Sequence, residues 1–374
     1  MTGWQVKSFE ECIEPVTYTR KIQRKDFLAD GDFPVVSQES EFVNGYWNEE
    51  VDLFRVNSPV VIFGDHTQVM KYVDFDFVLG ADGVKILEPS SFLVPKFFFY
   101  QLHTANLDSL GYARHYKLLK DLQIAYPSVA EQKRIVAILD EAFDGVATAN
   151  ANAEKNLQNA AAIFESRLEV LFKQHGQGWQ NRQLSTICRD ITVGHVGSMA
   201  KEYKQSGIPF LRSQNIRPFE VSLDNVVFID AAFHAALAKS RLQPGDVAIV
   251  RTGYPGTAAV VPPDLPDSNC SDLVIVRPGP EINSHYLAAF FNSAFGKAMV
   301  LGKIVGAAQK HFNVTAAKEV VLHLPPIKEQ GKIVQQVDEL RAETQRLESL
   351  YQQKLAALDE LKKSLLHEAF TGKL

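Results

Sequence analysis

The sequence predicts an α+β fold in which two α/β domains lie in tandem, separated by a long antiparallel coiled coil made of two repeated helices. Three observations predict this fold. A helical segment occurs twice, 198 residues apart, a strand-rich block precedes each copy, and the second copy carries a heptad pattern of apolar residues. We therefore divide the chain into segments 1–125, 126–175, 176–324 and 325–374.

The repeated segment is the clearest feature of the chain. It begins PSVAEQKRIV at Pro127 and PPIKEQGKIV at Pro325, and the register then holds without a gap to Phe172 and Phe370. A fixed offset over this length indicates an internal duplication.

The blocks that precede the two copies also resemble each other. The string GWQ begins at Gly3 and again at Gly178, and at the same offset of 175 residues FPVV at 33–36 falls on IPFL at 208–211. We interpret the chain as two half-proteins in tandem and expect a pseudo-twofold relation between them.

The composition is that of an ordinary globular protein. The chain has 374 residues, 46% hydrophobic and 22% charged, which is enough for two cores. Its three cysteines, Cys12, Cys188 and Cys270, lack metal-ligand spacing, so a reducing cytoplasm is favoured over secretion. No apolar run approaches the length of a membrane span, and the first residues do not form a signal peptide.

The charge is distributed unevenly between the segments. The net charge of −5 divides into −6 for 1–125, −2 for 126–175, +3 for 176–324 and 0 for 325–374. A mildly basic second block suits a polyanionic partner, whereas the acidic first block argues against simple electrostatic binding of nucleic acid. Any DNA contact by 1–125 must therefore depend on local basic clusters, and each such cluster is equally compatible with a solvated surface.

The second copy of the repeat predicts one long helix. Pro325 and Pro326 set its entry, Glu329 lies in the first turns where the helix dipole favours an acid, and neither Pro nor Gly occurs between 332 and 370. Apolar residues follow a heptad pattern typical of a coiled coil. One stripe consists of Ile333, Leu340, Leu347, Lys354 and Leu361, and the other of Val337, Thr344, Tyr351, Leu358 and Leu365.

The first copy is rich in alanine, which has the best helix propensity but buries little area. A helix with an alanine face and one with a leucine face are complementary, so we infer that the two helices pack on each other. The pseudo-twofold relation requires this packing to be antiparallel. The alternative is two unrelated amphipathic helices, each docked on its own domain.

The second variable block contains short strands that end in polar loops. GIPFLRSQNI at 207–216 is an apolar strand core that continues into a polar string, and GDVAIVRTGYPG at 245–256 is a buried strand followed by a glycine-flanked loop. YLAAFFNS at 286–293 predicts a helix, and GAAQKHF follows at 306–312.

The order of these blocks and helices resembles the specificity subunit of type I restriction-modification systems, and the resemblance covers essentially the whole chain. It is carried by the two Pro-x-[Val/Ile]-x-Glu-Gln helix starts and by the strings GIPFLRSQNI and GAAQKHF. The resemblance implies that 1–125 and 176–324 are target recognition domains 1 and 2, each for one half of a split DNA sequence. It also implies that 126–175 and 325–374 are spacer helices that dock methyltransferase subunits.

The first block follows a different pattern from the second. IFGDHT at 62–67 and DFDFVLGADG at 74–83 stand where the second block has its Arg-Thr-Gly loop, and the first block has no clear Gly-x-Ala-Gln string. Recognition of a different half-site explains this divergence, and truncation or weakened binding is the alternative.

The motifs that catalysis would require are missing from the sequence. It has no Asn-Pro-Pro-[Tyr/Phe] or Asp-Pro-Pro-Tyr string for base methylation, no phosphate-binding loop, and no acidic-x-Lys after Pro263-Asp264 or Pro266-Asp267 to complete a nuclease site. We therefore expect a non-catalytic chain without metal or cofactor. The resemblance implies that its partners use S-adenosylmethionine, ATP and Mg.

Sequence readout requires side chains that hydrogen-bond to base edges, such as Arg or Lys to guanine, Asn or Gln to adenine, and Ser or Thr to either. In the first block the candidate DNA-binding residues are Arg20, Lys21, Arg24, Ser37, Gln38, His66 and Thr67, with Arg114, His115 and Lys117 as further possibilities. In the second block they are Lys201, Arg212, Ser213, Gln214, Asn215, Arg251, Thr252, Tyr254, Gln309, Lys310 and His311. Ser213 and Gln214 follow a buried strand, so they are also candidates for a purely structural role.

The resemblance implies a subunit that recognises a bipartite, gapped DNA site for methyltransferase subunits, of which we expect two, and for restriction subunits. The alternatives are the specificity component of a type IIB-like system and a coiled-coil scaffold whose domains bind proteins or sugars. Loss of affinity with added salt distinguishes the scaffold from a DNA-binding protein.

Overall fold

The computed structural model describes residues 3–80, 83–105, 107–108, 110–111, 113–174, 176–199, 201–302 and 312–374. The chain forms two compact units. Unit 1 comprises Met1–Glu154 and Gln352–Leu374, and unit 2 comprises Lys155–Tyr351. The boundary between the units falls inside the two long helices. The division into segments 1–125, 126–175, 176–324 and 325–374, in which each repeated helix is a segment by itself, stays a prediction.

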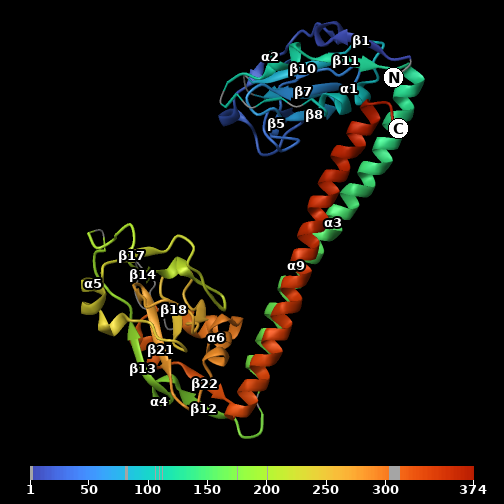
Figure 1. Ribbon diagram of the computed structural model, residues 1–374. Coiled ribbons are helices and arrows are strands. Elements are labelled where there is room, and N and C mark those ends of the chain that lie inside the picture. Colours follow the sequence, from blue (N-terminus) through green and yellow to red (C-terminus); the bar gives the residue numbers. More distant parts are fainter. Residues whose placement is uncertain are drawn as a thin grey trace. The chain divides into compact units, whose positions relative to one another are not determined.

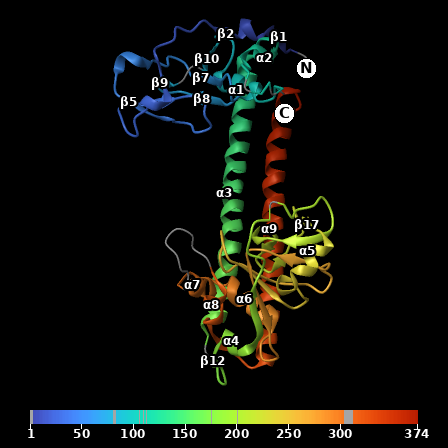
Figure 2. The same cartoon turned by 90° about the vertical axis from the view of Figure 1, so that its left-hand side faces the viewer.

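The two repeat copies form the long helices α3 (Val129–Lys173) and α9 (Ile327–Phe370). Within each unit a stretch of α3 lies beside a stretch of α9, and the two run in opposite directions (Figures 1 and 2). In unit 1 the Arg134 guanidinium donates to the carbonyl of Leu374 at 2.7 Å. The predicted fold class, including the antiparallel pairing of the repeated helices, is confirmed. Among the helices of the described residues, none is long and apolar enough to cross a membrane.

The buried face of α9 departs from the predicted heptads in its second half. Val337 and Thr344 are buried as expected, but Leu361 is 46% exposed and Lys354 is exposed, whereas Leu366 is buried. An α-helix has 3.6 residues per turn, so a strict seven-residue stripe rotates by about 20° per heptad. The stripe predicted from Ile333 onward therefore turns away from the packed face.

Unit 1 contains three small sheets. Its strands are β1 (Gln5–Ser8), β2 (Ile13–Glu14), β3 (Lys21–Ile22), β4 (Phe33–Val36), β5 (Gly45–Trp47), β6 (Leu53–Phe54), β7 (Val60–Gly64), β8 (Met70–Val73), β9 (Phe77–Gly80), β10 (Val84–Pro89) and β11 (Gln123–Tyr126). Its shorter helices are α1 (Pro95–Leu102) and α2 (Tyr116–Lys120), with 3-10 turns at Phe9–Cys12, Arg24–Asp26 and Glu50–Asp52. The strand orders are β2-β10-β7-β8, β3-β9-β4-β5 with β6 also on β9, and β1-β11.

Unit 2 has a related arrangement with an additional two-stranded sheet. Its strands are β12 (Gln180–Gln183), β13 (Cys188–Val193), β14 (Ile208–Leu211), β15 (Ile216–Arg217), β16 (Glu220–Val221), β17 (Val227–Ile229), β18 (Val247–Val250), β19 (Ala258–Val260), β20 (Asn269–Cys270), β21 (Leu273–Pro278) and β22 (Val321–Leu324). Its shorter helices are α4 (Leu184–Ile187), α5 (Ala231–Ala236), α6 (Ser284–Asn292), α7 (Ala294–Gly302) and α8 (Val314–Lys318), with 3-10 turns at Ser213–Asn215 and Ala238–Ser240. The sheets are β13-β21-β18-β19, β17-β14-β20, β12-β22 and β15-β16.

The strand registers define which residues of the two units correspond. Strand β4 runs parallel to β9 with Val36 opposite Leu79, as β14 runs parallel to β20 with Leu211 opposite Cys270. Strands β7 and β10 pair Gly64 with Val84, and β18 and β21 pair Val250 with Leu273. The faint similarity of the two variable blocks therefore reflects one sheet arrangement used twice. Corresponding positions are Gln38 and Ser213, Asp65 and Arg251, and Gly83 and Asp272.

Each unit builds its core partly from the long helices. In unit 1 the buried side chains of α1 pack with Ile135 and Leu139 of α3 and with Leu366 and Ala369 of α9. In unit 2 the buried side chains of α6 pack with Leu168 and Phe172 of α3 and with Ile333 and Val337 of α9. Burial of such aliphatic and aromatic side chains is the main favourable term in folding.

A hairpin tip in unit 2 also packs on both helices. Phe219, between β15 and β16, lies edge-on to Phe164 of α3 with ring centroids 6.0 Å apart, and the Arg341 guanidinium of α9 lies 5.2 Å from its ring. Its φ of 66° is left-handed, which is costly for a bulky residue, so these contacts offset local strain.

Candidate nucleic-acid interface

In unit 2 the loops that follow β14 and β18 meet at Asp272, directly before β21. The Thr252 hydroxyl donates to the Asp272 carboxylate, and Arg251 Nη1 lies 3.8 Å from Asp272 Oδ1. The Ser213 hydroxyl donates to the Asp272 carbonyl at 3.3 Å. These four residues are the unit 2 loop cluster, and three of them are DNA-binding candidates from two separate loops of the sequence.

Backbone hydrogen bonds fix the same junction. Arg251 N donates to the Asp272 carbonyl at 3.4 Å, and Ser271 N donates to the Leu211 carbonyl at 3.0 Å. His195 N donates to the carbonyl of Cys270 at 2.7 Å, so the Gly-His-Val-Gly loop also reaches this end of the sheet. Because several strands end together here, their polar loop residues are presented side by side.

Arg212 and Gln214 lie beside the cluster. Both side chains donate to the carbonyl of Asn225, Arg212 at 3.1 Å and Gln214 at 3.4 Å, and the Arg212 guanidinium lies 5.9 Å from the ring of Tyr203. Gln214 is exposed, whereas Arg212 is half-buried. The shared Asn225 carbonyl therefore holds the Arg212 and Gln214 side chains side by side near the surface of the loop.

Asn215 is fully buried and organises this loop. Its amide nitrogen donates to the carbonyls of Ser222 and Asp224 at 3.0 and 3.1 Å, and its oxygen accepts from Arg212 N at 3.0 Å. These bonds use most of the hydrogen-bonding capacity of the amide. Its structural role in this loop is therefore clear, and base contact by Asn215 stays a prediction.

Lys201 and Tyr254 make no side-chain hydrogen bond or ion pair with the residues of the cluster. Lys201 is exposed, and the ring of Tyr254 is 84% exposed in the loop after β18. Gln309, Lys310 and His311 lie outside the described residues.

In unit 1 the loops after β4 and β7 meet in the same way. The Thr67 hydroxyl donates to the carbonyl of Gln38 at 2.6 Å. A β-carbon at Gly83 would lie 2.1 Å from Gln38 Oε1, and one at Gly64 would lie 2.9 Å from Gln38 Cβ. Gln38, Gly64, Thr67 and Gly83 form the unit 1 loop cluster, in which the two glycines make room for the glutamine.

Residues beside this cluster have mainly structural contacts. Ser37 is fully buried, and its backbone N–H donates to the Asn44 side chain at 2.7 Å. His66 is half-buried beside Asp65, whose carboxylate accepts from Tyr116 N at 2.7 Å. His115 is buried, and its ring lies 3.0 Å from the carbonyl of Asp65.

A buried lysine supports the loop after β4. The Lys71 ammonium donates to Asn44 Oδ1 at 3.0 Å, to the carbonyl of Phe42 at 3.4 Å and to that of Glu41. Burial lowers the pKa of Lys71 to about 8, since desolvation disfavours the charged form. The buried Lys71 ammonium therefore holds the loop that carries Gln38 in place, although burial of its charge costs free energy.

The basic candidates of unit 1 separate into two groups. Lys21 donates to the carbonyl of Val84 at 3.3 Å, so it lies one residue from Gly83. Arg20 is turned toward Asp52 at 3.8 Å with 69% of its side chain exposed, and Arg24 is exposed in the 3-10 turn Arg24–Asp26. Of these three residues, Lys21 thus contacts the chain neighbour of a cluster residue. The exposed Arg114 and Lys117 flank His115 in sequence.

Asp272 and Gly83 are not among the DNA-binding candidates predicted from the sequence. That prediction selected cations, amides and hydroxyls as base-reading groups, and an acid or a glycine offers no such donor. A usable signal was present, since each residue directly precedes a buried strand that pairs with the loop-bearing strand.

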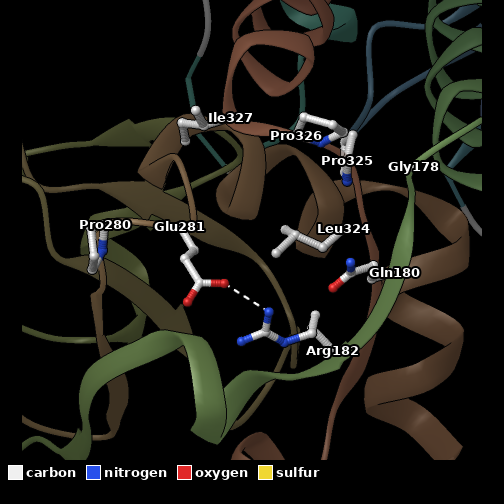
Figure 3. A pocket seen from close by; sticks show the side chains of 9 residues that line it. All are labelled: Gly178, Gln180, Arg182, Pro280, Glu281, Leu324, Pro325, Pro326 and Ile327. Atoms are coloured by element: carbon white, nitrogen blue, oxygen red, sulfur yellow. Dashed lines mark hydrogen bonds and ion pairs between the residues drawn. The ribbon is translucent and has the colours of Figure 1, made fainter.

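Two further features of the structure bear on ligand binding. Among the residues that the structure describes, no group of three or more His, Cys, Asp or Glu could hold a metal ion. A hollow of about 330 Å³ lies beside the start of α9. In Figure 3 Arg182 and Glu281 point toward one another there, and their 2.7 Å ion pair neutralises the charges of both.

The fold and the two loop clusters define a class of protein: a duplicated α/β protein whose two units share two antiparallel helices and carry polar loop clusters at corresponding strand ends. Residues 1–158 match the type I restriction modification DNA specificity domain. The chain resembles the specificity subunits of type I restriction enzymes over most of its length, which confirms the resemblance predicted from the sequence.

Two curated relatives illustrate this resemblance. The chain is 25% identical to the EcoKI specificity subunit of Escherichia coli (strain K12) over 275 residues, which are 68% of this chain but only 58% of that subunit. It is 24% identical to the EcoR124I/EcoR124II specificity subunit of Escherichia coli over 344 residues, or 87% and 83% of the two chains.

Two solved structures share the fold. A chain from a study of complex assembly and conformational transition of the type I R-M system has a TM-score of 0.78 at 18% identity, covering 100% of this chain and 99% of that one. The HsdS subunit from Thermoanaerobacter tengcongensis has a TM-score of 0.59 at 19% identity, covering 100% and 98%.

Proposed function

We propose that the chain recognises a bipartite, gapped DNA sequence and directs the methyltransferase and restriction subunits of a type I restriction-modification complex to it. Each unit would recognise one half of the sequence through its loop cluster. The chain itself would contribute no catalysis.

The observation that carries this proposal is the structural repeat of the loop clusters. Both lie after corresponding strands, β4 and β14 in one sheet and β7 and β18 in the other, yet their side chains differ. One arrangement with different polar groups suits two half-sites of different sequence, because hydrogen bonds to base edges distinguish base pairs. The resemblance of the whole chain to type I specificity subunits supports the same function.

The partners follow from the same proposal. Two methyltransferase subunits that use S-adenosylmethionine would act on the recognised DNA, and restriction subunits would add ATP- and Mg-dependent chemistry. Assembly would take place in the cytoplasm.

The experiment that tests this function is co-expression of the full chain with a methyltransferase subunit of a type I system, followed by single-molecule mapping of methylated bases. The expected result is methylation within one motif of two short specific sequences separated by a gap of fixed length. Methylation in a single continuous motif, or none above that of the methyltransferase alone, would contradict the proposal.

Salt dependence separates DNA recognition from a protein or sugar scaffold. A chain that contacts phosphates loses DNA affinity steeply as salt rises, because bound counterions are released on association. We expect this loss for the complex on duplex DNA. Absence of measurable DNA binding at low salt, with binding to a protein or glycan array instead, would favour the scaffold.

A further inference from the structure

We infer that Asp272 is a positioning residue for specificity, whose carboxylate holds Arg251 and Thr252 in the arrangement that reads one half-site. This inference rests on the proposed function. Asp272 would act through its two neighbours rather than by touching a base.

The contacts of Asp272 single it out within unit 2. Its carboxylate accepts from the Thr252 hydroxyl through one oxygen and lies 3.8 Å from the Arg251 guanidinium through the other. Its main-chain carbonyl accepts from the Ser213 hydroxyl. One residue therefore connects the loops after β14 and β18.

Arg251 depends on this carboxylate for its orientation. Its side chain is only 16% exposed, and its Nε is buried without a hydrogen-bond partner in the part of the chain that the structure describes. An unpaired buried donor is costly, and Asp272 supplies the nearby charge that offsets part of this cost. The remaining guanidinium donors make no hydrogen bond with a described residue, so they can serve an acceptor such as guanine.

The corresponding position in unit 1 differs. Gly83 stands there, and the amide of Gln38 fills the space that a side chain would need. Unit 1 thus presents an amide where unit 2 presents a carboxylate that holds an arginine and a threonine. The two loop clusters therefore carry different side chains at corresponding positions, as recognition of two different half-sites requires.

The negative charge of Asp272 does not favour sequence-independent binding of DNA. Its side chain is 46% exposed, and an exposed carboxylate at a DNA interface repels phosphates. Removing its charge should therefore maintain or raise affinity for unrelated DNA while it lowers discrimination. This opposite pair of effects is the signature of a positioning role, since a merely structural role would lower both.

The variant for the test is Asp272→Asn. Asp272 has a left-handed φ of 56°, and asparagine tolerates that conformation well, so the backbone is preserved. The amide can still accept from Thr252 but carries no charge for Arg251. The matched control is Asp190→Asn, which removes an equal charge from a 48% exposed carboxylate paired with Arg277 at 2.9 Å, outside the loop cluster.

The experiment uses the full chain purified with its co-expressed methyltransferase subunit and a randomised duplex library, with the bound DNA sequenced. We expect the wild-type complex and Asp190→Asn to enrich the same bipartite motif. Asp272→Asn should lose preference at one or two base pairs of one half-site, by roughly 5- to 150-fold per base pair. The other half-site should stay unchanged, and the affinity for an unrelated duplex should be equal or higher.

Three results would overturn the inference. Enrichment of both half-sites at wild-type strength by Asp272→Asn would show that the carboxylate positions nothing. Equal weakening of both half-sites together with a lowered melting temperature would show a general structural role. A wild-type complex that enriches no motif would overturn the proposed function, and this inference with it.

Discussion

Gln132 and Gln330, the same residue of the two repeat copies, make the same three hydrogen bonds in the two units. Each side-chain oxygen accepts from the backbone N–H just before a domain helix, Val94 N at 2.7 Å and Asn283 N at 2.8 Å. Each amide nitrogen donates to two carbonyls, at 2.9 and 3.0 Å for Gln132 and at 2.9 and 2.8 Å for Gln330. Both side chains are fully buried. The glutamine of the repeat motif therefore fastens the N-terminal end of α3 to unit 1 and that of α9 to unit 2.

Replacing Gln330 with alanine should destabilise unit 2. The change leaves buried backbone groups without partners, so we expect a loss of about 2–4 kcal/mol in the free energy of unfolding. Hydrogen exchange by mass spectrometry measures this loss unit by unit. Gln132→Ala should act in the same way on unit 1, and Gln335→Ala, an exposed residue bonded to Glu339, is the control. Equal protection in all three variants would contradict this account of the motif.

In unit 1 two contacts of Asp140 join α3 to α1, and we call them the Asp140 clamp. Asp140 of α3 pairs with Lys96 at 2.8 Å and accepts from the Tyr100 hydroxyl, and burial raises the pKa of that hydroxyl. The corresponding Asp338 of α9 is exposed and makes no hydrogen bond or ion pair with any described residue. It lines a hollow of about 160 Å³ with His285.

We therefore expect Asp140→Ala to destabilise unit 1 by about 1–3 kcal/mol, since it removes a charged acceptor from two partners. Asp338→Ala should change stability by less than about 0.5 kcal/mol. Thermal unfolding of both variants measures the difference. A similar effect of the two changes would show that the clamp contributes nothing.

The stability of unit 1 should depend on pH through Lys71. Its pKa in the folded chain is about 8, below its usual value of 10.5, so the unfolded chain binds more protons between these limits. Stability should therefore rise as pH increases from about 8 toward 10, by at most about 3 kcal/mol. Urea unfolding of the wild type and of Lys71→Met across this range measures the effect. A wild-type curve with the same pH dependence as Lys71→Met would contradict it.

Gly83→Ala should change recognition without unfolding unit 1. The added carbon would meet Gln38 Oε1, the end of a flexible side chain, so the amide is displaced while the backbone stays in place. We expect weaker preference in the half-site read by unit 1 and an unchanged second half-site, measured by library selection. Gly145→Ala, in α3 with open space around it, should leave the motif unchanged and stabilise the helix by up to about 1 kcal/mol. An unaltered motif in Gly83→Ala would remove Gln38 from the recognition account.

The spacing of the half-sites should follow the length of the helices. Inserting one heptad into both α3 and α9 adds roughly 10 Å at 1.5 Å per residue. If the helices act as a spacer, the gap should lengthen by about three base pairs at 3.4 Å each. Methylation mapping of the insertion variant measures the gap, and a gap of unchanged length would contradict the spacer role.

The duplication, the long helices and the strands with their polar loops could be predicted from the sequence, because periodicity and repeats are local properties. The exposure of Leu361 was not predicted, because the rotation of a helical stripe accumulates over many residues. The meeting of Ser213, Thr252 and Asp272 was not predicted either, because strand register brings together residues that are distant in sequence. Asn215 appears in the sequence as a base-reading amide, and only its three-dimensional surroundings reveal the backbone groups that it holds.

The central claim is that two corresponding loop clusters each read one half of a divided DNA sequence. Its most direct test is the methylation map of cells that express the methyltransferase subunit with the wild-type chain, with Gly83→Ala or with Asp272→Asn. We predict a bipartite motif in which the first variant relaxes one half and the second variant relaxes the other. Relaxation of the same half by both variants, or a motif without two separable halves, would contradict the claim.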